Sequence, residues 1–191
     1  MNLPNSLTLA RIILIPVFLL VASLKFSYAD YTAAGIFLIA ALTDGFDGYF
    51  ARKRNEETRL GKFLDPVADK ILVTAALICL VEMSRLAGWI AIVIISREIA
   101  VTGLRAFAAI EGLVIPSNIL GKTKTVTQII AVIILFIGDN PFSLVHLPFG
   151  AAAVTIALVF TVWSGLDYFI KFARSFNRKN VSDKTVHEEG L

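Results

Sequence analysis

The chain has 191 residues, of which 57% are hydrophobic and 17% are charged, and its formal net charge is +3. Soluble domains are about 45–50% apolar and about 25% charged, so this composition excludes an ordinary soluble protein and predicts an integral membrane protein. The single cysteine, Cys79, excludes a disulfide within the chain and is expected to be a small buried apolar residue.

Six apolar stretches come near the roughly 20 residues that a membrane-spanning helix requires. They cover residues 6–25, 32–52, 66–83, 87–111, 121–138 and 148–171. The first stretch has some features of a signal peptide, but no small-residue cleavage site is evident and we expect it to be retained. The sequence therefore predicts one all-helical membrane domain at 1–173, followed by a polar tail of weak order at 174–191.

Positive side chains are distributed unevenly between the predicted helix ends. Five of them lie between residues 52 and 62, others lie at the fourth connection and the C-terminus, and only Lys25 and Arg85 lie on the opposite side. By the positive-inside rule, both termini and the second and fourth connections are cytoplasmic. We expect a multi-pass protein of the cytoplasmic membrane, built as a bundle of six transmembrane helices with a polar cavity that faces the cytoplasm.

Four aspartates lie within 26 residues, where the second predicted helix ends and the third begins: Asp44, Asp47, Asp65 and Asp69. Each pair is spaced three or four residues apart, so its members share a helix face. An aspartate at the centre of a membrane helix costs about 2.5–3.5 kcal/mol, and bare acids there require a cation. With no histidine or cysteine nearby, an all-oxygen site for Mg²⁺ or Mn²⁺ is favoured. A helix N-cap at Asp65 and ion pairs with nearby basic residues remain alternatives.

Glycine and arginine residues accompany the acids. Gly48 follows Asp47 directly and either permits close helix packing or lets a ligand approach the backbone. Arg52 and Arg59 are candidate partners for phosphate, whereas the neighbouring positive residues are expected to anchor the chain to anionic headgroups.

Residues 44–69 match a two-part motif at every fixed position. The motif is D-x-x-D-G-x-x-A-R, followed after eight residues by G-x-x-x-D-x-x-x-D. It resembles the signature of the CDP-alcohol phosphotransferase family. The resemblance implies a six-helix membrane enzyme, a homodimer, that uses two divalent metal ions to displace CMP from a CDP-linked donor. It makes the four aspartates metal ligands and Asp69 also the base for the acceptor hydroxyl. Gly48 and Arg52 would contact the CDP moiety, with Thr58 as a further hydroxyl contact.

A second set of charges bears on the acceptor. Arg97 and Arg105 share one face of the fourth predicted helix over about 12 Å, and Lys122 and Lys124 begin the fifth. We interpret them as a cationic pocket for an acceptor that itself carries phosphate. The alternatives are pairing of Arg97 with Glu98 or an aspartate, and anchoring of the lysines at the membrane surface.

The resemblance extends over most of residues 2–130 to the branch of the family that uses sn-glycerol 3-phosphate, while the last helix adds little. It rests on Asn2-Leu3-Pro4-Asn5, Leu7-Thr8, Arg11, the segment 63–70, Ser96-Arg97-Glu98-Ile99 and the segment 121–125. It implies transfer of a phosphatidyl group from CDP-diacylglycerol to sn-glycerol 3-phosphate, giving phosphatidylglycerophosphate and CMP. Inositol phosphate or phosphatidylglycerol remain alternative acceptors, and no nucleic-acid partner is expected. A cation transporter is disfavoured, because its acids would extend toward both membrane faces.

Overall fold

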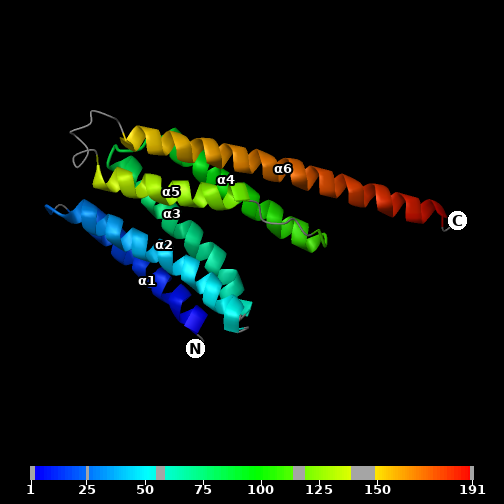
Figure 1. Ribbon diagram of the computed structural model, residues 1–191, viewed down its shortest axis with the longest axis horizontal. Helices are drawn as coiled ribbons and strands as arrows, with labels where there is room; N and C mark the ends of the chain where they lie inside the picture. Colours follow the sequence, from blue (N-terminus) through cyan, green and yellow to red (C-terminus); the bar gives the residue numbers. More distant parts are fainter. Residues whose placement is uncertain (1–2, 25, 55–58, 114–118, 139–148, 190–191) are drawn as a thin grey trace.

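The computed structural model describes the backbone of residues 3–24, 26–54, 59–113, 119–138 and 149–189. Side chains are described within residues 9–24, 26–43, 67–113, 119–138 and 149–177. The described chain forms six helices and no strands: α1 (Leu3–Ser23), α2 (Ala29–Arg54), α3 (Arg59–Glu82), α4 (Gly88–Ile110), α5 (Ile119–Ile137) and α6 (Phe149–Glu189) (Figure 1). This confirms the predicted all-helical architecture, and each predicted stretch overlaps one helix.

Among the residues whose side chains are described, two helical segments are long and apolar enough to cross a membrane, Ile119–Ile137 and Phe149–Asn177. Only 28% and 33% of their most apolar windows are buried within the protein, whereas the core helix of a soluble protein would be mostly buried. Shorter apolar segments occupy Leu9–Ser23 and Ala29–Thr43. Apolar surface of this extent requires an apolar environment, which is consistent with a membrane protein.

Three phenylalanines from different helices form the centre of the core. Phe18 of α1 lies with its ring centroid 6.0 Å from that of Phe37 on α2 and 5.5 Å from that of Phe136 on α5. All three are fully buried, and Leu80 of α3 belongs to the same cluster. Aromatic packing therefore joins α1, α2 and α5, and α3 adds Leu80 to the same core, while α6 packs against α5 and α4.

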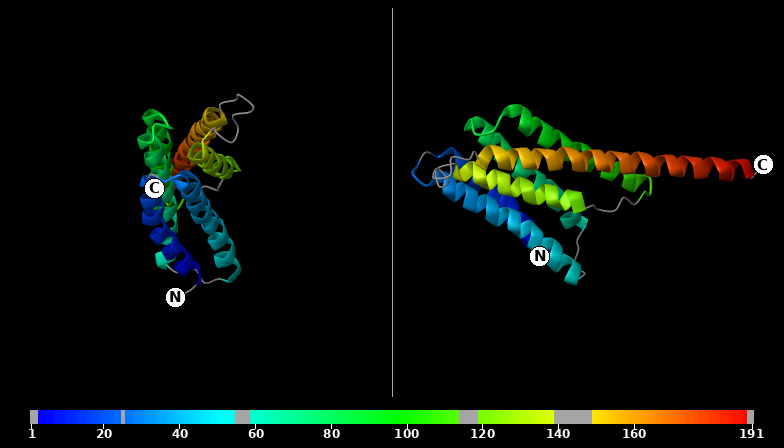
Figure 2. Two further views of the ribbon diagram at one scale, coloured as in Figure 1. Left: turned by 90° about the vertical axis from the view of Figure 1, so that its left-hand side faces the viewer. Right: turned by 45° about the horizontal axis from the view of Figure 1, so that its top comes forward.

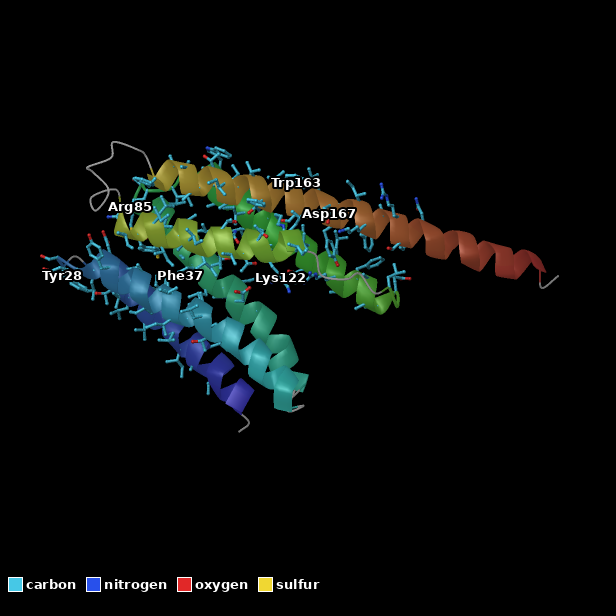
Figure 3. All side chains as sticks on the ribbon, viewed as in Figure 1. Tyr28, Phe37, Arg85, Lys122, Trp163 and Asp167 are labelled. Atoms are coloured by element: carbon cyan, nitrogen blue, oxygen red, sulfur yellow. The ribbon has the colours of Figure 1, made fainter. Side chains whose placement is uncertain are left out.

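The turn between α3 and α4 fixes one end of the bundle. Arg85 in this turn pairs with Asp30 at the start of α2 and donates a hydrogen bond of 2.7 Å to the carbonyl of Phe136. A cation near the C-terminus of α5 satisfies carbonyl groups that have no partner within the helix. The turn between α3 and α4 is thus joined to α2 and α5 at the end where Figure 3 labels Arg85 and Tyr28.

The C-terminal segment, which was expected to be a polar tail, continues the last helix as far as Glu189. Helix α6 continues without a break to Glu189 and extends well beyond the other helices (Figure 2). The sequence contains neither glycine nor proline between Gly165 and Gly190, so it offers no signal that would end the helix earlier. In addition, Phe172 and Phe176 lie 6.0 and 6.2 Å, between ring centroids, from Phe107 of α4. Within the predicted tail, Phe176 is thus in contact with α4.

Candidate active site

The signature residues lie where α2 ends and α3 begins. The backbone of α2 carries positions 44, 47, 48 and 52, and that of α3 carries positions 65 and 69. Both helix ends lie at the same end of the bundle as the N-terminus (Figure 1). Thr58 lies outside the described residues, as do the side chains of Asp44, Asp47, Arg52 and Asp65 and the surroundings of Gly48.

Asp69 is the one predicted metal ligand whose side chain is described. Among the described side chains, no group of three or more His, Cys, Asp or Glu residues gathers as a metal site. Three of the four predicted carboxylates fall outside that set, so the metal site remains a prediction.

A cavity of about 410 Å³ lies between α3, α4, α5 and α6. It brings Asp69 of α3 together with the four cations predicted to bind the acceptor, Arg97, Arg105, Lys122 and Lys124. In Figure 3, Lys122 and Asp167 mark its α5 and α6 sides. Asp69, one of the four aspartates of the predicted acidic site, therefore lines the same cavity as the four residues of the predicted basic pocket.

The cavity has a surplus of positive charge. Its described lining includes six basic and three acidic side chains. Clefts lined by charge of one sign raise the local concentration of ligands of the opposite sign, and low-dielectric walls strengthen the effect. A phosphate ester with two negative charges matches this surplus.

Glu98 is the centre of a buried charge network at the wall of the cavity. Its Oε1 accepts hydrogen bonds from Arg97 Nη1 at 2.9 Å and from Lys124 Nζ at 2.5 Å. The side chains of Glu98, Arg97 and Lys124 are 15%, 14% and 5% exposed. The alternative pairing of Arg97 with Glu98 is therefore present, and burial of Lys124 is inconsistent with anchoring at the membrane surface.

Pairing with Glu98 does not neutralise all of the positive charge beside the cavity. Two cations share one carboxylate, so Arg97, Lys124 and Glu98 together carry a net positive charge. Arg105 lies over the ring of Tyr168, 5.4 Å from its centroid. A cation–π contact uses the face of the aromatic ring and leaves N–H groups of Arg105 able to bind phosphate. The site therefore keeps a net positive charge, and Arg105 can present donors to an anion.

Helix α6 supplies residues that the sequence analysis missed. Ser164, Asp167, Tyr168 and Lys171 all line the cavity, and Lys171 Nζ pairs with Asp167 at 2.7 Å. Their spacing in the sequence could have indicated that these residues line a site, because polar residues at positions i, i+3, i+4 and i+7 of an otherwise apolar helix form one polar face. The family resemblance seen in the sequence covers most of residues 2–130, so it gave no reason to assign a role to the last helix.

An apolar helical protein that places a carboxylate beside clustered cations is suited to act on phosphate esters at a membrane. The CDP-alcohol phosphatidyltransferase family model matches residues 1–163, so the chain belongs to this family of transferases. The resemblance inferred from the aspartate signature is thereby confirmed.

Curated relatives cover most of the chain. A Bacillus subtilis (strain 168) protein is 50% identical over 182 residues, which cover 89% of this chain and 94% of the relative. A Rickettsia bellii protein is 41% identical over 169 residues, covering 88% and 93%, and a Salmonella typhimurium protein is 41% identical over 172 residues, covering 87% and 92%. All three are named CDP-diacylglycerol–glycerol-3-phosphate 3-phosphatidyltransferase.

Proposed function

We propose that the protein transfers the phosphatidyl group of CDP-diacylglycerol to sn-glycerol 3-phosphate, giving phosphatidylglycerophosphate and CMP. The observation that carries this proposal is the basic cavity, which brings Arg97, Arg105, Lys122 and Lys124 beside Asp69. The names of relatives at 41–50% identity over most of the chain agree with this reaction. An acceptor that carries its own phosphate explains why so many cations line the cavity.

Asp69 is proposed to act as the general base. It lines the cavity and lies close enough to Lys124 to interact with it electrostatically. Its carboxylate would accept the proton of the acceptor 1-hydroxyl, whose oxygen then forms a bond to the phosphorus that bears diacylglycerol. The bond between that phosphorus and the bridging oxygen breaks, and CMP leaves with the bonding electron pair. The cations of the cavity bind the acceptor phosphate and hold the hydroxyl beside the base.

The aspartate quartet is proposed to hold two divalent cations, Mg²⁺ or Mn²⁺. Use of a divalent metal is general in the family, and carboxylate oxygens suit these hard cations. Bound there, the metal supplies positive charge to the diphosphate of the donor and to the departing phosphate. The proposed ligands are Asp44, Asp47, Asp65 and Asp69, and the proposed contacts to CDP-diacylglycerol are Gly48, Arg52 and Thr58.

We further propose that all six helices cross the cytoplasmic membrane, with the cavity and both termini on the cytoplasmic side. The distribution of positive residues supports this orientation. It would let soluble glycerol 3-phosphate enter from the cytoplasm while the acyl chains of the donor stay in the bilayer. A homodimer is proposed from the family resemblance.

An acceptor panel tests the proposal. Purified protein with CDP-diacylglycerol and Mg²⁺ should release CMP with sn-glycerol 3-phosphate, and far less with inositol phosphate, serine or phosphatidylglycerol. Substitution of Arg105 or Lys122 by alanine should raise the KM for glycerol 3-phosphate more than that for CDP-diacylglycerol. Asp30→Asn at the other end of the bundle is the control and should leave both KM values unchanged. Preference for another acceptor would refute the assignment.

A further inference from the structure

Arg97 crosses the buried backbone of Gly165 on α6. A Cβ atom at position 165 would lie 3.1 Å from Arg97 Cγ and 3.5 Å from Arg97 Nε. Such a contact is tighter than ordinary van der Waals packing, so the arginine stem would have to move. The helical glycines Gly103 and Gly121 have no such neighbour, because a Cβ there would meet nothing within 4 Å. Gly165 is therefore distinguished by the side chain that lies against it.

Ser164, the residue before Gly165, holds the other end of the same side chain. Its hydroxyl donates to the carbonyl of Thr161 at 3.1 Å and accepts a hydrogen bond from Arg97 Nη2 at 2.9 Å. Since a serine hydroxyl has one proton, donation to Thr161 leaves its lone pairs for the arginine. Ser164 is buried, so water does not compete freely for this contact. The guanidinium is thus held by α6 through Nη2 and by Glu98 through Nη1.

We propose that Ser164 and Gly165 are positioning residues that set the affinity for the acceptor by holding Arg97 in its binding orientation before the acceptor arrives. This inference rests on the proposed function. An unrestrained arginine loses rotamer freedom when it binds an anion, and one already held by packing and hydrogen bonds loses less. Helix α6 then contributes to acceptor binding through Arg97, although the acceptor-binding cations themselves lie on α4 and α5.

Paired alanine substitutions test the inference. Gly165→Ala and Gly103→Ala each add one methyl group to a helical glycine, and both favour the helix by intrinsic propensity. The KM for sn-glycerol 3-phosphate, the KM for CDP-diacylglycerol and kcat are measured for each variant, with the unfolding temperature in detergent. We expect Gly165→Ala to raise the acceptor KM roughly 5- to 30-fold, the upper value corresponding to the rotamer freedom of an arginine side chain. The donor KM should stay unchanged, and Gly103→Ala should match the wild type.

A second pair separates positioning from a general loss of structure. Ser164→Ala removes the acceptor of the Arg97 hydrogen bond, whereas Ser164→Thr retains a hydroxyl. We expect Ser164→Ala to raise the acceptor KM and Ser164→Thr to restore it toward the wild-type value. If Gly165→Ala does not fold, this pair decides the question, and equal acceptor KM values for wild type and Ser164→Ala overturn the inference.

Two further outcomes distinguish failure of this inference from failure of the proposed function. If Gly165→Ala behaves like Gly103→Ala, or raises both KM values equally, Arg97 is not positioned for the acceptor and the inference fails while the proposed function stands. If the wild-type protein releases no CMP with sn-glycerol 3-phosphate, the proposed function itself fails. The wild-type measurement precedes the variants, so the two failures are distinguished.

Discussion

Removing the charge of Glu98 should destabilise the protein far more than removing a partly exposed acid. Glu98→Gln keeps the shape and one carbonyl acceptor, but it leaves Arg97 and Lys124 without the carboxylate they share. Breaking a buried ion pair by removing one partner typically costs about 3–5 kcal/mol, because the remaining charge stays buried without compensation. For a chain of 150–250 residues, 1 kcal/mol corresponds to roughly 2–4 °C in Tm. A loss of about 3 kcal/mol therefore predicts a Tm lower by roughly 6–12 °C.

Thermal unfolding in detergent, followed by the helical circular dichroism signal, measures this difference. The control is Asp30→Asn, which removes the acid from a pair whose side chains are 33% and 34% exposed. Arg85 keeps its hydrogen bond to Phe136 in that variant. Pairs with this exposure contribute at most about 1 kcal/mol, so the control should lose less than roughly 4 °C.

A double variant tests whether loss of the contact between Glu98 and Lys124 causes the lower Tm. Lys124→Met removes one of the two cations, so adding it to Glu98→Gln should cost less than the separate effects predict, with a coupling energy of at least about 1 kcal/mol. A Glu98→Gln protein whose Tm lies within about 2 °C of the wild type would refute the argument. Additive effects of the two substitutions would also refute it, because they would show that Glu98 and Lys124 do not interact in the folded protein.

Three further predictions concern the proposed chemistry and the core. Asp69→Asn should lower kcat at least about 100-fold without changing the helical circular dichroism signal, since it removes the proposed base; a kcat within tenfold of the wild type would contradict that role. Excess EDTA should abolish CMP release and added Mg²⁺ or Mn²⁺ should restore it, whereas activity that persists in the chelator would exclude the proposed metal site. Phe18→Ala should lower the free energy of unfolding by about 3–5 kcal/mol, because Phe18 is fully buried against Phe37 and Phe136; a loss below about 1 kcal/mol in thermal unfolding would contradict the described core.

Sequence reasoning was most successful where structure depends on local properties. A helix satisfies its backbone hydrogen bonds within one segment, so long apolar stretches predict where helices lie. The predicted six helices are present, and the spacing of the four aspartates pointed to the family that the comparison then confirmed. Residues 174–189 continue α6 as a helix, and the sequence contains no glycine or proline between Gly165 and Gly190 that would end it. The polar tail at 174–191 stays a prediction.

The sequence by itself determined an apolar helical protein, the positions of its helices, the acidic signature and a set of cations suited to a phosphate-bearing acceptor. Only the tertiary structure decided which of these side chains meet. Arg97 and Ser164 are 67 residues apart, and Lys124 reaches Glu98 from a different helix. Such contacts depend on how each helix is rotated about its axis and which helix packs beside it, and the pattern within one helix specifies neither. For that reason the role of α6 beside the cavity emerged only from the packed bundle.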